Sequence, residues 1–442
     1  YGVSKGNILI INPDKAKAAK IDVIENDINE RNDDLAEGST AVRTPPQQDY
    51  SLVPSERRIT QEYVVKADDD YPYTDSMDDS LFVQVPDTVN MAVILPFMLQ
   101  LPEQNKNAQL FTEFYKGLMI AVDNFSSNTS GHHINLYAYD SAASNDTIAS
   151  IMRRPEMARM SVIIGPDNEA QLKYISDYMT PGSVLFNVFN VRSSLWENNP
   201  SVMQANIPHS PMLEKAVSEF LNMYEEYTPV FIARIDGEAD KDPFTSLLRQ
   251  NLDNRGIAYE EIAFKNLLGA KDLEKLVPDS NYVFVPISGT RSEFAKFSEA
   301  IRKFGESRVT SSTRVFGYPD WITFRGEYFT RLCELEATIY TRFYYNENDP
   351  ASVAFNNLYK ETYGSDMLDA APVQGVLGYD TGMYLLGLIK DYGTDFMSHL
   401  SPFTGLQSAL DFTKNGNSGD VNNALLIVTF APDGKIFKTT VE

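Results

Sequence analysis

The stretch VNMAVILP at residues 89–96 decides the fold of this chain of 442 residues. It is apolar except for Asn90 and ends at a proline, which predicts a strand buried in a parallel sheet. The residues after it alternate between helical and strand patterns: helices are expected at 111–125, 147–152 and 170–179, and strands at 134–139, 161–164 and 184–189. Such alternation predicts an α/β fold with a doubly wound parallel sheet.

The same alternation restarts after residue 207. Strands are expected at 230–235, 259–264, 282–286, 314–316 and 336–344, and helices at 211–224, 244–255, 272–276, 291–304, 350–363 and 378–392. Asp433-Gly434, between two apolar runs, predicts a closing hairpin. Two α/β units of similar size predict two lobes with a cleft between them.

Three chain crossings are expected to join the lobes. Prolines at 208 and 211 interrupt regular structure at the first, and a turn-rich segment marks the third. The crossings are placed near 207–211, 335–341 and 396–403. Lobe 1 then takes residues 88–207 and 342–397, and lobe 2 takes residues 208–341 and 398–442.

The composition excludes several classes of protein. The formal net charge of −23 argues against binding to nucleic acid or to anionic lipid, because both need a clustered basic surface. Hydrophobic residues make up 43% of the chain, which excludes wholesale disorder. The single cysteine, Cys333, rules out an intrachain disulfide and leaves the compartment open. The longest apolar stretches, at 91–95 and 384–389, are too short for a membrane span.

An acidic segment precedes the first lobe. Residues 26–90 hold 15 acidic and 5 basic side chains, and apolar residues are sparse there. We therefore expect residues 26–87 to form an extended linker. The alternative is that the apolar triplets at 63–65 and 81–83 dock on the following domain as short strands.

The first residues resemble part of a known module. Tyr1-Gly2-Val3-Ser4 predicts a turn and a helix cap, Ile8, Leu9 and Ile11 follow at helical spacing, and Asn12-Pro13 ends the helix. This pattern resembles the C-terminal half of a LysM module, which implies binding to the N-acetylglucosamine-containing glycan of peptidoglycan through residues 1–25. The alternative is an ordinary capped helix. Because the chain opens at Tyr1 rather than Met, we expect a fragment or a processed form.

From residue 88 onward, an ordered set of features resembles the type I periplasmic binding proteins, the branched-chain amino acid receptor family. The set comprises Leu95-Pro96, the glycine-containing helix 114–118, Tyr139-Asp140-Ser141, residues 163–166, Gly378-Tyr379-Asp380-Thr381-Gly382, and the closing segments 403–406 and 423–430. The resemblance implies two Rossmann-like lobes, three crossovers and a ligand held between the lobes. It also implies a periplasmic location.

The expected binding site lies where the carboxyl ends of the strands meet, because open α/β sheets bind ligands there. The residues placed there are Pro96, Asp167, Asn168, Glu169, Asn190, Arg192, Asp236, Ser288, Asp320 and Trp321. Trp321 is expected either to stack on a ligand or to pack in the core.

The expected site departs from the family pattern. Amino-acid receptors of the family hold the ligand carboxylate with Ser and Thr, but this loop reads Asp167-Asn168-Glu169. Residues 203–206, where the family usually carries an arginine, read Met-Gln-Ala-Asn, although Arg192 could supply an anion partner. The acids favour a cationic or polyhydroxyl ligand over a branched-chain amino acid. The alternative is that they are solvated loop residues at helix N-termini.

No catalytic or metal motif is present in the sequence. His-Glu-x-x-His, paired cysteines, a nucleophile elbow and a phosphate loop are all missing. His132-His133 reads as a solvated turn and Cys333 as a packing residue. We therefore expect a protein that is not an enzyme and uses neither metal nor cofactor.

Two functions remain open. The first is a binding module, anchored to peptidoglycan through LysM, that holds a small polar solute or a cell-envelope protein. The second is a regulatory, lipoprotein-type activator of cell-envelope enzymes without a solute, since the same fold occurs in an outer-membrane lipoprotein that activates penicillin-binding proteins. Both imply the periplasm or the periplasmic face of the outer membrane.

Overall fold

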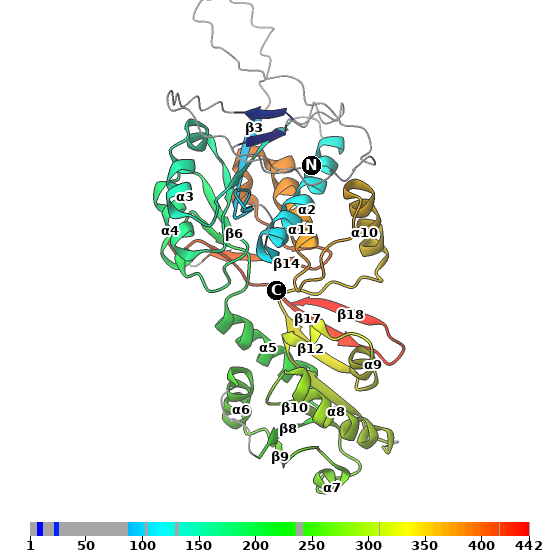
Figure 1. Cartoon of the computed structure of the whole chain (residues 1–442). Coiled ribbons are helices and arrows are strands. Elements are labelled where there is room, and N and C mark those ends of the chain that lie inside the picture. Colours follow the sequence, from blue (N-terminus) through cyan, green and yellow to red (C-terminus); the bar gives the residue numbers. More distant parts are fainter. Residues whose placement is uncertain are drawn as a thin grey trace, which may run out of the picture.

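The computed structural model describes strands at 7–11 and 22–25, and residues 87–101, 105–128, 132–235, 242–308, 310–414 and 416–441. Two α/β lobes lie one above the other and meet where the chain crosses between them (Figure 1). The acidic linker predicted at 26–87 and its docking triplets lie outside the described residues.

Lobe 1 is built on a nine-stranded sheet in the order β15-β16-β7-β6-β5-β3-β4-β1-β2. Strands β3 to β7 and β16 run parallel to their neighbours, whereas β1, β2 and β15 are antiparallel additions at the two edges. The strands are β1 (Asn7–Ile11), β2 (Asp22–Glu25), β3 (Asp87–Leu95), β4 (His132–Asp140), β5 (Val162–Ile164), β6 (Val184–Asn187), β7 (Val202–Gln204), β15 (Phe412–Lys414) and β16 (Asp420–Asn422).

Helices cover this sheet, and two of them pack unusually closely. The helices of lobe 1 are α2 (Lys106–Asn128), α3 (Asn145–Met152), α4 (Glu169–Tyr178), α10 (Pro350–Tyr363) and α11 (Gln374–Tyr392), with short 3₁₀ turns at Pro155–Arg159, Leu195–Asn198 and Gly393–His399. A Cβ on Gly378 of α11 would lie 1.8 Å from the Phe114 carbonyl oxygen of α2, so only glycine fits. The close contact explains the glycine in the quoted motif 378–382.

Lobe 2 is built on a seven-stranded sheet in the order β18-β17-β12-β11-β10-β8-β9. Its strands are β8 (Thr228–Arg234), β9 (Glu260–Phe264), β10 (Tyr282–Pro286), β11 (Thr313–Gly317), β12 (Ala337–Thr341), β17 (Leu425–Phe430) and β18 (Ile436–Val441). Its helices are α5 (His209–Met223), α6 (Pro243–Arg255), α7 (Ala270–Leu273), α8 (Arg291–Glu306) and α9 (Glu327–Glu334), with a 3₁₀ turn at Pro319–Thr323. The antiparallel β17–β18 pair is the predicted hairpin around Asp433-Gly434.

The third crossing differs from the prediction. The segment after α11 stays in lobe 1, where it forms the small pair β13 (Phe403–Thr404) and β14 (Ala409–Leu410), and β16 pairs in parallel with β7. The chain enters lobe 2 only between β16 and β17, so the placement of the third crossing at 396–403 is wrong, as is the assignment of 398–422 to lobe 2. Strands of two or three residues carry no readable periodicity, which is why the sequence pattern missed them.

The start of the chain also differs. Residues 7–11 form β1, which pairs antiparallel with β4, so the helix expected from Ile8, Leu9 and Ile11 is wrong. Four consecutive aliphatic residues, three of them isoleucine, suit a strand as well as a helix face. Residues 1–6 and 12–21 of the LysM resemblance lie outside the described part, and that interpretation stays a prediction.

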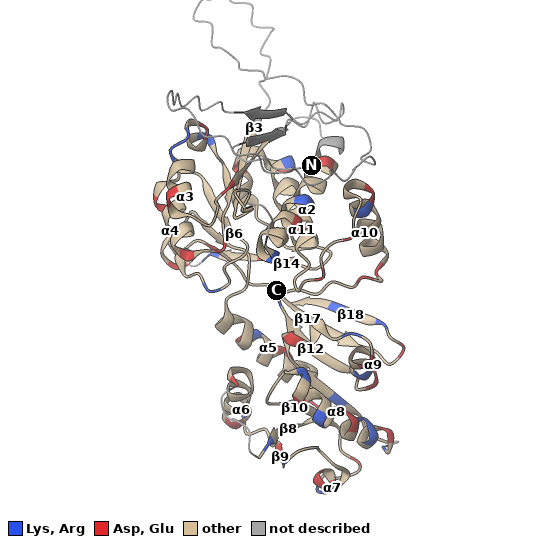
Figure 2. Cartoon of the chain, viewed as in Figure 1, with Lys and Arg blue, Asp and Glu red and all other residues tan. Residues whose placement is uncertain are grey.

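Charged residues are spread over the outer helices of both lobes (Figure 2). Within the described residues, no helix is both long enough and apolar enough to cross a membrane.

Candidate functional site

The loops at the carboxyl ends of β5 and β6 are joined by one carboxylate. Glu169, at the first position of α4, accepts hydrogen bonds from Asn190 Nδ2 at 2.8 Å and from Ser193 Oγ at 3.2 Å. Beneath them the buried Asn187 Nδ2 donates to Gln204 Oε1 at 2.6 Å. The predicted residues Glu169 and Asn190 are therefore brought together, but they bond to each other within lobe 1.

The other predicted residues of lobe 1 have simpler surroundings. Asn168 caps α4 by accepting from the Gln171 amide at 3.2 Å, and Asp167 and Arg192 are exposed. Pro96 is buried at the end of β3. The loop after Pro96 is held by Asp140, whose carboxylate accepts from the Met98 and Leu99 amides.

In lobe 2, Trp321 is a core residue. Its side chain is 1% exposed, its Nε1–H donates to the Gly289 carbonyl at 2.9 Å, and its ring lies 4.9 Å from that of Phe294. The interpretation of Trp321 as a stacking platform for a ligand is wrong for this arrangement, and the core-packing alternative holds. An indole with a satisfied N–H and so little exposed surface mainly stabilises the lobe.

The remaining lobe 2 residues stay near the surface. Ser288 Oγ donates to Thr290 Oγ1 at 3.3 Å, and Thr290 caps α8. Asp320 is exposed, and Asp236 lies outside the described residues. Between the described predicted residues of lobe 1 and those of lobe 2, no direct hydrogen bond or ion pair occurs.

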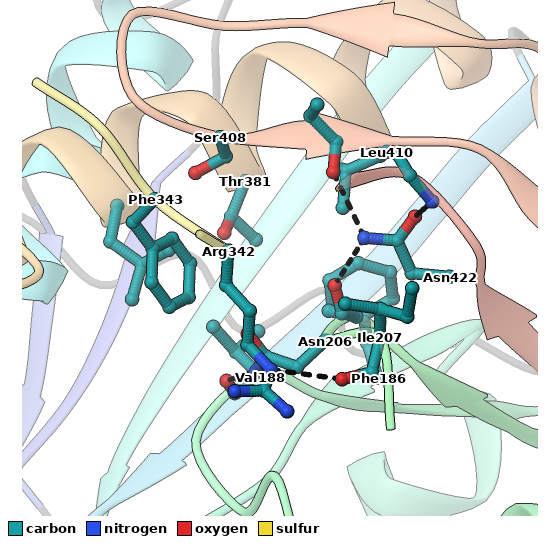
Figure 3. Close-up of a pocket in the computed structure, with 14 residues that line it drawn as sticks. Phe186, Val188, Asn206, Ile207, Arg342, Phe343, Thr381, Ser408, Leu410 and Asn422 are labelled. Atoms are coloured by element: carbon teal, nitrogen blue, oxygen red, sulfur yellow. Dashed lines mark hydrogen bonds between the residues drawn. The ribbon is translucent and has the colours of Figure 1, made fainter. Parts of the chain in front are cut away.

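The three crossings meet at a small cavity that the sequence patterns missed (Figure 3). Arg342 Nε, on the second crossing, donates to the Ile207 carbonyl at 2.9 Å on the first. Asn422, on the third crossing, donates to the carbonyls of Ala205 and Ala409, both at 2.9 Å. The cavity has about 10 Å³ of free space, enough for about one water. These side chains tie the crossings to one another, which is the arrangement expected of a hinge.

Arg342 is the only ionised side chain that lines the hinge cavity. Burial lowers the pKa of its guanidinium, although an arginine stays protonated in proteins. It lies with Asn206 in this cavity, so an arginine does stand beside the segment 203–206 where the family usually carries one, but a different crossing supplies it. The sequence signal that could have found Arg342 is its position as a cation directly after the buried strand 337–341.

On the far side of the junction, a buried carboxylate organises the loop after β13. Asp380 of α11 is 1% exposed and accepts from the amides of Leu406, Gln407 and Ser408 at 2.8 to 2.9 Å. Burial raises the pKa of Asp380, while the three amide donors oppose that rise. Lys438 of β18 approaches the same loop from lobe 2 and donates to the carbonyls of Gly405 and Leu406 at 3.1 and 2.8 Å. Burial lowers the pKa of Lys438.

The described residues offer no cluster of three or more His, Cys, Asp or Glu side chains that could hold a metal ion. Cys333 is 5% exposed, and burial raises the pKa of its thiol, which makes it a poor nucleophile. The side chains of His132 and His133 are not described.

No family model matches this sequence, and no curated protein matches it. Solved structures do match. A branched-chain amino acid ABC transporter protein from Rhodospirillum rubrum aligns over 79% of this chain and 99% of its own, with 14% identity and a TM-score of 0.54. A periplasmic ligand-binding protein of a branched-chain amino acid transporter from Burkholderia xenovorans aligns over 80% and 94%, with 14% identity and a TM-score of 0.46.

A third match is the C-domain of LpoA from Haemophilus influenzae, a regulator of PBP1A. It aligns over 79% of this chain and 99% of its own, with 12% identity and a TM-score of 0.45. At these identities the likeness concerns the fold. Together with the two sheets described above, the similarity to the Rhodospirillum protein shows that residues from 87 onward have the two-lobed α/β fold of the type I periplasmic binding proteins.

Proposed function

We propose that this chain is a non-catalytic binding module that holds a protein partner rather than a free amino acid. The main support is that Glu169 accepts hydrogen bonds from Asn190 and Ser193. The amide and hydroxyl that could hold a ligand carboxylate are already used. A ligand carboxylate placed there would also be repelled by Glu169.

A small polar solute is the second candidate, and Arg342 favours it. Its guanidinium has five N–H donors, and the cavity around it contains no carboxylate. A solute with an anionic group could reach this cation if the lobes open about the crossings. The present free space of about 10 Å³ is far below the ~300 Å³ of small-molecule pockets.

Native mass spectrometry of the purified 442-residue chain separates the two candidates. We expect a single species at the mass of the polypeptide, 49.7 kDa, under gentle ionisation. A co-purified small molecule that is lost in an Arg342→Met variant, but kept in an Arg255→Met variant, would contradict the proposal and establish binding of a solute. Arg255 is exposed at the end of α6, away from the expected site, and serves as the matched control.

We also propose that the module works at the cell wall, in the periplasm or on the periplasmic face of the outer membrane. The support is the LysM-like pattern at residues 1–13. The natural full-length protein should sediment with purified peptidoglycan, whereas a chain shortened to begin at Asp87 should stay in the supernatant. Equal sedimentation of both would contradict the anchor and leave the proposed partner binding untouched. A role as regulator of cell-envelope enzymes is the form of partner binding that fits this location.

A further inference from the structure

Two adjoining cavities form a groove on the side of the junction that faces β18. The larger has about 680 Å³ and lies between β18 of lobe 2 and the loop 403–406 with α10 and α11 of lobe 1. The smaller has about 170 Å³ and lies between lobe 2 and residues 344–348, which follow the second crossing. They share Tyr344, Asn346 and Ile436 as lining residues, so they lie side by side. We call them together the β18 groove.

One wall of the β18 groove is a free sheet edge. Among the described strands, β18 pairs with β17 alone and ends the seven-stranded order. In an antiparallel pair, half of the backbone N–H and C=O groups of each strand point away from the partner strand. Within the described part of the chain, no backbone hydrogen bond reaches residues 436–441 from the other side. An edge of this kind is a template for one more strand.

The groove also offers a place for a large side chain. The smaller cavity is walled by aromatic rings, namely Trp321, Phe324, Phe329, Tyr344, Tyr345 and Phe430. Along the larger cavity, Phe437 of β18 is 58% exposed, which is high for a phenylalanine. Because the smaller cavity meets β18 at Ile436, a strand added to that edge would bring a side chain to the aromatic cavity at one end.

The charged side chains along the β18 groove favour some extended peptide segments over others. Arg325 and Glu347 pair with each other at 3.8 Å, and the buried Asp380 accepts from backbone amides. Lys438 donates to backbone carbonyls and keeps its charge, which interacts with Asp349. Asp349 remains exposed, with Oδ1 accepting from the Ala351 amide at 3.0 Å. The net charge of −23 also attracts a basic partner at long range.

We propose that the β18 groove binds an extended, basic peptide segment of a partner protein as an added strand on β18. A large apolar side chain of the segment fills the aromatic cavity, and a Lys or Arg lies near Asp349. The contacts of an added strand are main-chain hydrogen bonds, with side-chain pockets supplying the selectivity. The proposal goes beyond the function proposed above, because the β18 groove lies on another face than the strand ends near Glu169. It does not depend on what binds at those strand ends.

The test uses the full chain and the fluorescein-labelled peptide acetyl-KTVKVFKT-amide, followed by fluorescence anisotropy. We expect saturable binding, weakened about tenfold or more when the backbone amides along one edge of the peptide are N-methylated, because methylation removes strand donors. Phe437→Ser should weaken binding about tenfold, whereas Tyr178→Ser, a 64% exposed ring on α4, should not.

Asp349→Asn keeps the helix-capping oxygen and removes the charge. It should weaken the lysine peptide about threefold to tenfold and leave a peptide with Gln in place of each Lys unaffected. No saturable binding up to about 1 mM peptide would overturn the proposal. Equal binding of the N-methylated peptide, or an unchanged affinity of Phe437→Ser, would overturn it as well. The native mass spectrometry experiment described above tests for a bound solute, and its outcome does not depend on these peptide titrations.

Discussion

The two sides of the junction between the lobes are held in different ways. On the cleft side, the polar groups at the strand ends bond within one lobe, as Glu169 does with Asn190 and Ser193. On the β18 side, hydrogen bonds cross between the lobes. Lys438 of lobe 2 donates to Gly405 and Leu406 of lobe 1, and Thr440 Oγ1 lies 3.3 Å from Thr404 Oγ1.

This difference indicates about which side of the junction the two lobes rotate relative to each other, which we call the pivot. A side whose bonds stay within a lobe can open without breaking any of them, whereas a side with crossing bonds must break them to separate. The lobes should therefore rotate about the β18 side and open on the cleft side. The buried carboxylate of Asp380 fixes the loop that receives Lys438, so it supports the pivot from within lobe 1.

The largest expected effect is from Asp380→Ala. The change leaves three amides, at 406–408, without their acceptor, and each unsatisfied buried amide costs about 1–3 kcal/mol. We expect the free energy of unfolding to fall by about 3–5 kcal/mol, measured by urea denaturation. The control is Asp369→Ala, an exposed acid near the start of α11, which should change stability by less than about 0.5 kcal/mol. Similar losses of unfolding free energy in both variants would contradict the stabilising role of Asp380 at the pivot.

Lys438→Met tests the crossing bonds themselves. Methionine keeps the length of the side chain but leaves the carbonyls of Gly405 and Leu406 without their donor. Stability should fall by about 1–2 kcal/mol, and small-angle scattering should show a larger radius of gyration. Lys435→Met, whose lysine pairs at the surface with Asp433, should change neither quantity. An unchanged radius in Lys438→Met would place the pivot elsewhere.

The sequence predicted the two parallel sheets because their buried strands contain continuous apolar runs, such as 91–95 and 282–286. It missed β13 to β16 because strands of two or three residues have no periodicity, and the third crossing was misplaced for that reason. At the candidate site, the sequence predicted that Glu169 lies near Asn190, because they follow the carboxyl ends of the neighbouring parallel strands β5 and β6. Asn422 and Lys438 could not be found that way, because their partners are backbone carbonyls far along the chain, which leave no pattern in the side chains.

Glu169→Gln tests the cleft side. Glutamine retains one acceptor but loses the charge that strengthens the bonds from Asn190 and Ser193. We expect a loss of about 1 kcal/mol in stability and faster amide hydrogen exchange in residues 190–193. The exposed neighbour Asp167→Asn should leave the exchange of this loop unchanged. The same acceleration in both variants would mean that Glu169 does not hold the loop.

The smallest expected effect is a pH dependence at Asp380. Because burial raises its pKa above the ordinary 3.8, the folded chain binds the proton more tightly than the unfolded chain. As pH falls from above the raised pKa towards 3.8, the free energy of unfolding of the wild-type chain should therefore rise relative to that of Asp380→Asn. Urea denaturation of both proteins across that window should show the wild-type advantage growing as pH falls. A shrinking advantage would give the opposite sign and contradict the burial argument.

The most direct test of the central claim is calorimetric titration of the full chain with leucine, isoleucine and valine. The strand-end acceptor and donors bond to one another, so we predict no saturable heat up to about 1 mM of any of the three amino acids. Micromolar binding of one of them, abolished by Arg342→Met, would show that the cleft is a solute site and would contradict the account.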